Sequence, residues 1–223
     1  MNLSDLQTFA AELCTDREFQ RYSAASHTQV LNHAQEEWNL EAAILKDTVT
    51  LTTVDGTRSY ALSGLTGTPI RFDRVTHKGI ELSRRDKAWF DLYASDDWSD
   101  DIGTPKQYYI DVSDPDNQNI FLYPIPQSAD AGANLIVEYV KSPTALSGST
   151  DIPFNSNTLM YPYHHGLAYR GAAFLLLRDP SQENMIKGSG YLKTSNAILT
   201  KVIEVFKSAE KEEPYRLRGG RYW

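Results

Sequence analysis

The chain has 223 residues, of which 41% are hydrophobic, and its formal net charge at pH 7 is -7. This composition supports a sizeable core and excludes an intrinsically disordered chain. The last nine residues contain three arginines and no acid, so residues 1–214 carry -7 minus 3, or -10. A body this acidic argues against binding nucleic acid by neutralising its phosphates.

The first residues do not have the pattern of a targeting segment. The stretch MNLSDLQTFAAELCTD lacks a basic leader and a long apolar run, so we do not expect a signal peptide. The densest apolar run, AAFLLL at 172–177, is far too short to span a membrane. The single cysteine, Cys14, excludes an internal disulfide and favours a reducing compartment. We therefore expect a soluble cytosolic protein in which Cys14 is buried apolar filler.

Two helices are expected before residue 47. Residues 3–14 predict a short helix that Ser4 caps. Residues 24–46 predict a longer helix, because apolar residues recur there every three or four positions and form one stripe. That stripe consists of Leu31, Ala34, Trp38, Ala42 and Leu45.

Strand patterns then fill residues 47–143, in six or seven short segments. The stretch TVTLTTVDGTRSYAL contains Asp-Gly, a strong hairpin signal, and IRFDRVTHKGIELSR repeats the design with HKG as its turn. Two alternating stretches, KQYYIDV and NIFLYPI, flank the turn-rich SDPDNQ, and ANLIVEYVKSP reads as a further strand. The spacing predicts an antiparallel sandwich or a small barrel.

Helical patterns return after the small, polar linker SPTALSGSTDIPFNSN. Residues 158–178 predict one helix, and residues 182–211 predict a last helix that Ser181 caps. The apolar stripe of the first consists of Leu159, Tyr163, Leu167, Gly171 and Phe174. The stripe of the second consists of Met185, Leu192, Leu199, Val202, Phe206 and Ala209.

The order of helices, strands and helices predicts an α+β fold. The helices at either end cannot bury their stripes alone, so we expect residues 1–46 and 152–213 to form one helical bundle. Residues 47–151 then form an inserted antiparallel β block with its linker. Residues 214–223 form an extended C-terminal arm, because Pro214 stops the helix before it.

His164 and His165 are the first candidates for chemistry. Adjacent residues on a helix point about 100° apart, so both cannot face one small site. No HExxH pattern accompanies them, and we expect surface or interface histidines. The stretch DVSDPDNQN resembles a calcium loop, but Asn119 and Ile125 replace the glycine and glutamate that such a loop needs. We therefore expect a hairpin turn there.

Four carboxylates gather in the stretch SDDWSDDIG, at Asp96, Asp97, Asp100 and Asp101. Paired carboxylates could perform acid–base chemistry or hold a hard cation. No other catalytic group brackets them, so the alternatives are a solvated acidic loop and a negative surface facing a channel or a partner. We assign no catalytic, cofactor-binding or metal-binding residue anywhere in the chain.

The arm has a different character. Tyrosine, tryptophan and arginine are the residue types that anchor protein interfaces. We interpret the arm as a segment that docks on another protein, the alternative being a frayed end. Its docking residues would be Tyr215, Arg216, Leu217, Arg218, Arg221, Tyr222 and Trp223.

Several stretches carry a resemblance to a known family. Between residues 103 and 170 they are GTPKQYYI, NIFLYPIP, LIVEYVKSPTALS, and DIPF leading into LMYPYHHGLAYRGA. VLNHAQEEW and RSYAL add to the pattern. Together they resemble the head-to-tail adaptor, or head completion, proteins of tailed phages and prophages.

The resemblance implies a structural protein of the virion, made in the host cytoplasm. Such adaptors bind below the portal protein, usually as a twelve-fold ring whose helical bundles pack side by side. The ring extends the channel through which double-stranded DNA passes without specific binding, and it offers the attachment surface for the next neck or tail protein. On this interpretation the arm docks on the portal and folds there, the acidic body gives DNA no resting site, and no membrane is involved.

Two other interpretations stay open. The chain could be another neck or tail ring, such as a tail terminator or tubular protein, which would bind a tube protein. It could also be a β-sandwich ligand-binding module or hydrolase that uses the loop of Asp96, Asp97, Asp100 and Asp101. The second interpretation predicts a metal or glycan ligand.

Overall fold

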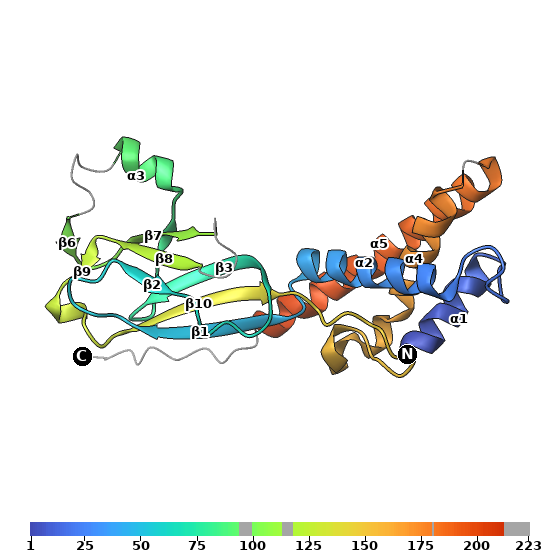
Figure 1. The fold of residues 1–223 in the computed structure, drawn as a ribbon, viewed down its shortest axis with the longest axis horizontal. Helices are drawn as coiled ribbons and strands as arrows, with labels where there is room; N and C mark the ends of the chain where they lie inside the picture. Colours follow the sequence, from blue (N-terminus) through green and yellow to red (C-terminus); the bar gives the residue numbers. More distant parts are fainter. Residues whose placement is uncertain (94–99, 113–117, 180, 212–223) are drawn as a thin grey trace, which may run out of the picture. The chain divides into compact units, whose positions relative to one another are not determined.

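A computed structural model describes residues 1–93, 100–112, 118–179 and 181–211 (Figure 1). The chain divides into two compact units. One contains Met1–Leu45 and Ser142–Trp223, and we call it the helical unit. The other contains Lys46–Lys141, and we call it the β unit. The fold is α+β, as the sequence predicts.

The helical unit contains four α-helices and two short 3-10 segments in its described part. The helices are α1 (Leu3–Leu13), α2 (Ala24–Ala42), α4 (His165–Leu177) and α5 (Gln182–Lys211). The 3-10 segments, Phe154–Ser156 and Thr158–Tyr163, precede α4. Because Pro162 lies inside the second of them, the predicted helix of residues 158–178 begins as an α-helix only at His165.

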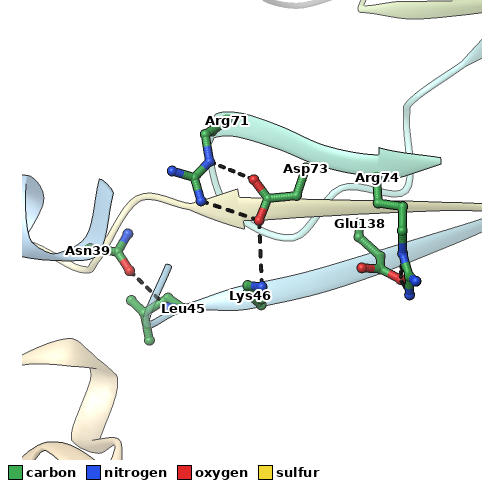
Figure 2. A network of polar contacts seen from close by, with 7 residues as sticks. All are labelled: Asn39, Leu45, Lys46, Arg71, Asp73, Arg74 and Glu138. Atoms are coloured by element: carbon green, nitrogen blue, oxygen red, sulfur yellow. Dashed lines mark hydrogen bonds and ion pairs between the residues drawn. The ribbon is translucent and has the colours of Figure 1, made fainter. Parts of the chain in front are cut away.

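Local hydrogen bonds fix where α1 and α2 begin and end. The cap of α1 is Asn2, whose side chain accepts from the Asp5 amide at 2.9 Å, so the predicted Ser4 cap is wrong. The Asp5 carboxylate accepts in return from the Asn2 amide, which completes a capping box. Helix α2 ends at Ala42, four residues earlier than predicted, because Ala43 adopts a left-handed conformation. Beyond it, Asn39 Oδ1 accepts from the Leu45 amide at 2.8 Å (Figure 2).

Helix α4 is the central helix of its unit. It packs against α1, α2 and α5, and its buried residues lie on every side, which is typical of an enclosed helix. A Cβ atom on Gly166 would lie 2.2 Å from the Trp38 ring, and one on Gly171 would lie 3.3 Å from Val30 and Leu31. Rising numbers on α2 therefore match falling numbers on α4, and the two helices are antiparallel.

Helix α5 is also antiparallel to α4. Gly188 lies against Leu177 near one end of the pair, and Ser195 Oγ donates to the Gly166 carbonyl at 3.0 Å near the other. Ser181 Oγ accepts from the Asn184 amide at 3.4 Å, which confirms the predicted cap. Since both α2 and α5 run opposite to α4, they run in the same direction.

The two predicted stripes of the C-terminal helices are right only in part. Leu199 and Val202 are buried on α5, but Met185 is 51% exposed. Leu159 is 47% exposed, because it lies in the 3-10 segment before α4. Where α5 packs on α4, its buried face consists mainly of small and polar residues. It consists of Asn184, Gly188, Ser195, Leu199 and Val202.

The described strands of the β unit form three sheets, and not the closed barrel that was one of the predicted forms. Their orders are β1-β10-β3-β4, β2-β8-β7-β5 and β6-β9. One hydrophobic core contains side chains from both four-stranded sheets. The bounds are β1 Lys46–Thr52, β2 Ser59–Ala61, β3 Pro69–His77, β4 Ile80–Glu81, β5 Ser83–Arg84, α3 Lys87–Tyr93, β6 Ile102–Gly103, β7 Gln107–Asp111, β8 Asn119–Tyr123, β9 Ile125–Pro126, a 3-10 turn at Ser128–Asp130 and β10 Asn134–Lys141.

Two of the three predicted strand pairings are confirmed. β3 pairs antiparallel with β4 around Lys78 and Gly79, and β7 pairs antiparallel with β8. The hairpin predicted at Asp-Gly is wrong, because β1 pairs with β10 and β2 pairs with β8. Gly56 does form a turn, but the turn carries the chain from one sheet to the other. The pairs β5–β7 and β6–β9 are parallel, so the sheets are mixed and not purely antiparallel.

Ion pairs cross the first sheet on its exposed side (Figure 2). Asp73 of β3 lies 2.5 Å from Arg71 Nε and 3.7 Å from Lys46 Nζ of β1. Arg74 pairs with Glu138, its register partner on β10. Exposed pairs of this kind add at most about 1 kcal/mol each, so the buried core and not these pairs holds the sheet.

Candidate interaction surfaces

The acidic loop lies partly within the described residues. Asp96 and Asp97 lie outside them, whereas Asp100 is exposed and Asp101 is half-buried. Asp101 Oδ2 accepts from the Tyr123 hydroxyl at 2.7 Å, and its carbonyl accepts from the Ile125 amide at 2.8 Å. This carboxylate therefore anchors its loop to β8 and β9. A negative surface facing a channel or a partner stays a prediction.

No metal centre is evident in the ranges that the structure describes, since no three His, Cys, Asp or Glu residues there could hold one ion. Of the stretch likened to a calcium loop, residues 111–119, the central residues 113–117 lie outside the described residues. So does the whole arm, with the docking residues Tyr215, Arg216, Leu217, Arg218, Arg221, Tyr222 and Trp223. The role of the arm stays a prediction.

The adjacent histidines have different environments. His164 is fully buried, so its prediction as a surface or interface residue is wrong. Its Nδ1 lies 3.3 Å from the Met1 amino group and 3.1 Å from the Met1 carbonyl. Burial, reinforced by the charge of that amino group, lowers the pKa of His164 to about 4. His165 is half-buried, and its ring meets the edge of Tyr169 with 6.4 Å between ring centroids.

Cys14 fills the core as predicted. It is 4% exposed and belongs to the hydrophobic cluster of the helical unit. Burial raises the pKa of its thiol to about 12, with the charge of Asp16 acting in the same direction. The thiol therefore stays protonated and unreactive at neutral pH.

A buried polar network that the sequence analysis missed joins three helices. Arg170 of α4 is 8% exposed, and its Nε donates to Glu37 of α2 at 2.6 Å. Its Nη1 donates to Asn196 of α5 at 2.8 Å, and its Nη2 lies 3.8 Å from Glu41 of α2. The signal was present in HGLAYRGAAFLLL, because an arginine inside so apolar a helix must find partners. The sequence does not show which helices supply them.

A surface groove of about 520 Å³ lies between α2 and α4. Val30 and Phe174 are its apolar residues, and His33, Glu36 and Arg178 are among its polar ones. A hollow of about 460 Å³ lies along residues 144–156, and one of about 210 Å³ lies beside β5 and β7. None of these three hollows in the described part of the chain combines a histidine with a serine, threonine or cysteine among its lining residues.

In the part of the chain that the structure describes, no helix is both long enough and apolar enough to cross a membrane. The polar side chains described above, Asp101 and Arg170 among them, hold loops and helices of this α+β fold together. The family model of the SU10 adaptor protein matches residues 1–202, and the chain belongs to this family of phage adaptor proteins. The resemblance to head-to-tail adaptor proteins is thereby confirmed, and adaptors are a structural class and not a class of enzyme. No curated protein matches the chain.

Proposed function

We propose that this protein is a structural head-to-tail adaptor of a phage virion, which assembles as a ring under the portal protein. The observation that carries the proposal is the adaptor family match over residues 1–202. In this ring the helical bundles of neighbouring copies pack side by side, twelve copies completing the circle. The ring extends the DNA channel and offers the surface to which the next tail or neck protein attaches.

The arm supplies the attachment to the portal. Its three arginines and three aromatic residues can form directed hydrogen bonds and bury large areas. The family match ends at residue 202, so the arm lies outside the matched region. We therefore assign the arm to recognition of one particular portal, and we expect it to fold on binding.

The charge of the body suits a channel component. Residues 1–214 carry -10, obtained as -7 minus the +3 of the last nine residues. Like charge gives passing DNA no resting site, and carboxylates such as Asp100 and Asp101 would contribute to that surface. The chain would be made in the host cytoplasm and would function in the virion, without a cofactor.

The test mixes the purified protein with its portal ring and images the mixture by electron microscopy, using the full chain and a chain that ends at Pro214. We expect a ring of adaptor subunits on the portal with the full chain and none with the shortened one. If both chains bind equally, the role of the arm is wrong. If neither binds the portal but the full chain binds a tail-tube protein, the chain belongs to another neck or tail ring.

A further inference from the structure

The outward faces of α2 and α5 are opposite in charge. On α2, Glu36 is exposed and makes no ion pair within the described residues. On α5, Lys193 and Lys201 are exposed and likewise make no ion pair there, and Glu204, an exposed acid beyond them, lies more than two turns from Lys193. By contrast, Lys187 and Glu183 of α5 already form an ion pair with each other. The unpaired acid on α2 and the unpaired lysines on α5 are therefore complementary in charge, although they lie on different faces of the same unit.

The two faces occupy the same level along the common direction of the α2 and α5 axes. Arg170 binds Glu37 of α2 and Asn196 of α5 at once, and Trp38 and Ile198 both lie against Gly166. Positions on the two helices therefore correspond when about 160 is added to the α2 number. Because α2 and α5 run in the same direction, this correspondence holds along both helices. Glu36 then stands within three residues of the level of Lys193, about 4.5 Å along the axis.

The two faces also match in relief. Leu40 is 45% exposed on α2, and at its level α5 presents the small exposed residues Ala197 and Thr200. Ile186 is 66% exposed on α5, and at its level α2 presents the exposed Ala25. On each helix a large aliphatic side chain is exposed at a level where the other helix carries small side chains.

We infer that α2 of one copy docks along α5 of the next copy, with the two helices parallel. Glu36 then faces Lys193, and Leu40 rests on Ala197. The contact is heterologous, because it joins two different faces of the same unit at one height. Contacts of this kind close into a ring when the rotation between copies allows it. The inference deepens the ring assembly proposed above by naming the surfaces through which neighbours meet.

The test uses short cross-links between differently tagged full chains, without portal protein. One chain carries Leu40→Cys and the other Ala197→Cys, and the buried native Cys14 stays unreactive because burial raises its pKa to about 12. The control replaces Ala197→Cys by Ile186→Cys, which is exposed on the same helix but about 16 Å farther along it. We expect the 40–197 product in at least about tenfold excess over the 40–186 product. Equal yields, or no 40–197 product at the highest attainable concentration, overturn the inference.

Charge reversal gives an independent measurement by analytical ultracentrifugation at low salt. Glu36→Lys alone and Lys193→Glu alone should each weaken self-association at least about tenfold, and an equimolar mixture of the two should recover part of it. Glu18→Lys makes the same charge change on the connector between α1 and α2 and should leave association unchanged. If the control weakens association as much as Glu36→Lys, net charge and not this contact is responsible. Failure here leaves portal docking by the arm unaffected, since that was tested by shortening the chain at Pro214.

Discussion

Replacing Gly166 by alanine should destabilise the helical unit by about 2 kcal/mol. The added Cβ would lie 2.2 Å from the Trp38 ring and 2.9 Å from Ile198, where ordinary contact begins at 3.4 Å. Trp38 is completely buried, so its ring cannot move aside without disturbing α2. Overpacking of this kind costs up to about 3 kcal/mol, and the better helix propensity of alanine returns about 1 kcal/mol.

Gly190 on α5 provides the matched control. It also lies inside a helix, but a Cβ there would meet nothing within 4 Å. Gly190→Ala should therefore stabilise the unit by about 1 kcal/mol through propensity alone. The two variants make the same chemical change and should differ by about 3 kcal/mol, with opposite signs relative to the unaltered chain.

Urea unfolding followed by far-ultraviolet circular dichroism measures both variants. With a slope of about 2 kcal/mol per molar urea, the midpoint should fall by about 1 M for Gly166→Ala and rise by about 0.5 M for Gly190→Ala. Since the chain has two units, amide hydrogen exchange of α4 should assign the loss to the helical unit. If Gly166→Ala is as stable as the unaltered chain, Trp38 does not pack on α4 as described.

Three further predictions concern buried polar groups. Arg170→Ala should lower the free energy of unfolding by about 3 kcal/mol, because it leaves the paired Glu37 without its cation; urea unfolding that shows no loss contradicts this network. The pKa of His164 is lowered to about 4, so the stability that His164 contributes is present above pH about 6.5 and is lost as the pH falls toward 4. Between pH 7 and pH 5 we expect the free energy of unfolding to fall by about 2 kcal/mol, and His164→Gln should largely abolish this fall. If the variant loses stability with pH as steeply as the unaltered chain, the assignment to His164 is wrong. Tyr60→Phe should cost about 1–2 kcal/mol in thermal unfolding, because its hydroxyl bonds the Val54 backbone; a melting temperature equal to that of the unaltered chain would show that water replaces the hydroxyl.

Elements that depend on neighbouring residues were predictable from the sequence. Apolar residues at helical spacing predicted α2, because a stripe can be read from the sequence alone. Alternation predicted β7 and β8, and the short turn between β3 and β4 predicted their pairing. In each case the residues that interact lie within about 15 positions of each other, so one short stretch of sequence contains both the pattern and the contact.

Contacts between distant residues were not predictable in this way. The Asp-Gly turn has a strong local hairpin signal, yet β1 pairs with β10, whose residues lie more than 80 positions later. His164 is buried beside Met1, and Arg170 finds partners on α2 and α5. A sequence shows that such a polar group needs a partner but does not name it. For the same reason the face of α5 that packs on α4 could not be separated from the face that bears Met185.

The pairing of β1 with β10 explains how a β unit can interrupt a helical unit. In this pair Lys46, the first residue of the β unit, lies opposite Val140, one residue before its last. Opposite residues of antiparallel strands have Cα atoms about 5 Å apart, so the chain enters and leaves the β unit at nearly one point. An insert whose two ends lie this close together can interrupt the helical unit with little change in the fold of that unit. A hairpin at the Asp-Gly turn would instead have paired β1 with β2, and β10 would then pair with β3 alone. The long-range pairing that local signals missed is thus the one on which this domain organisation depends.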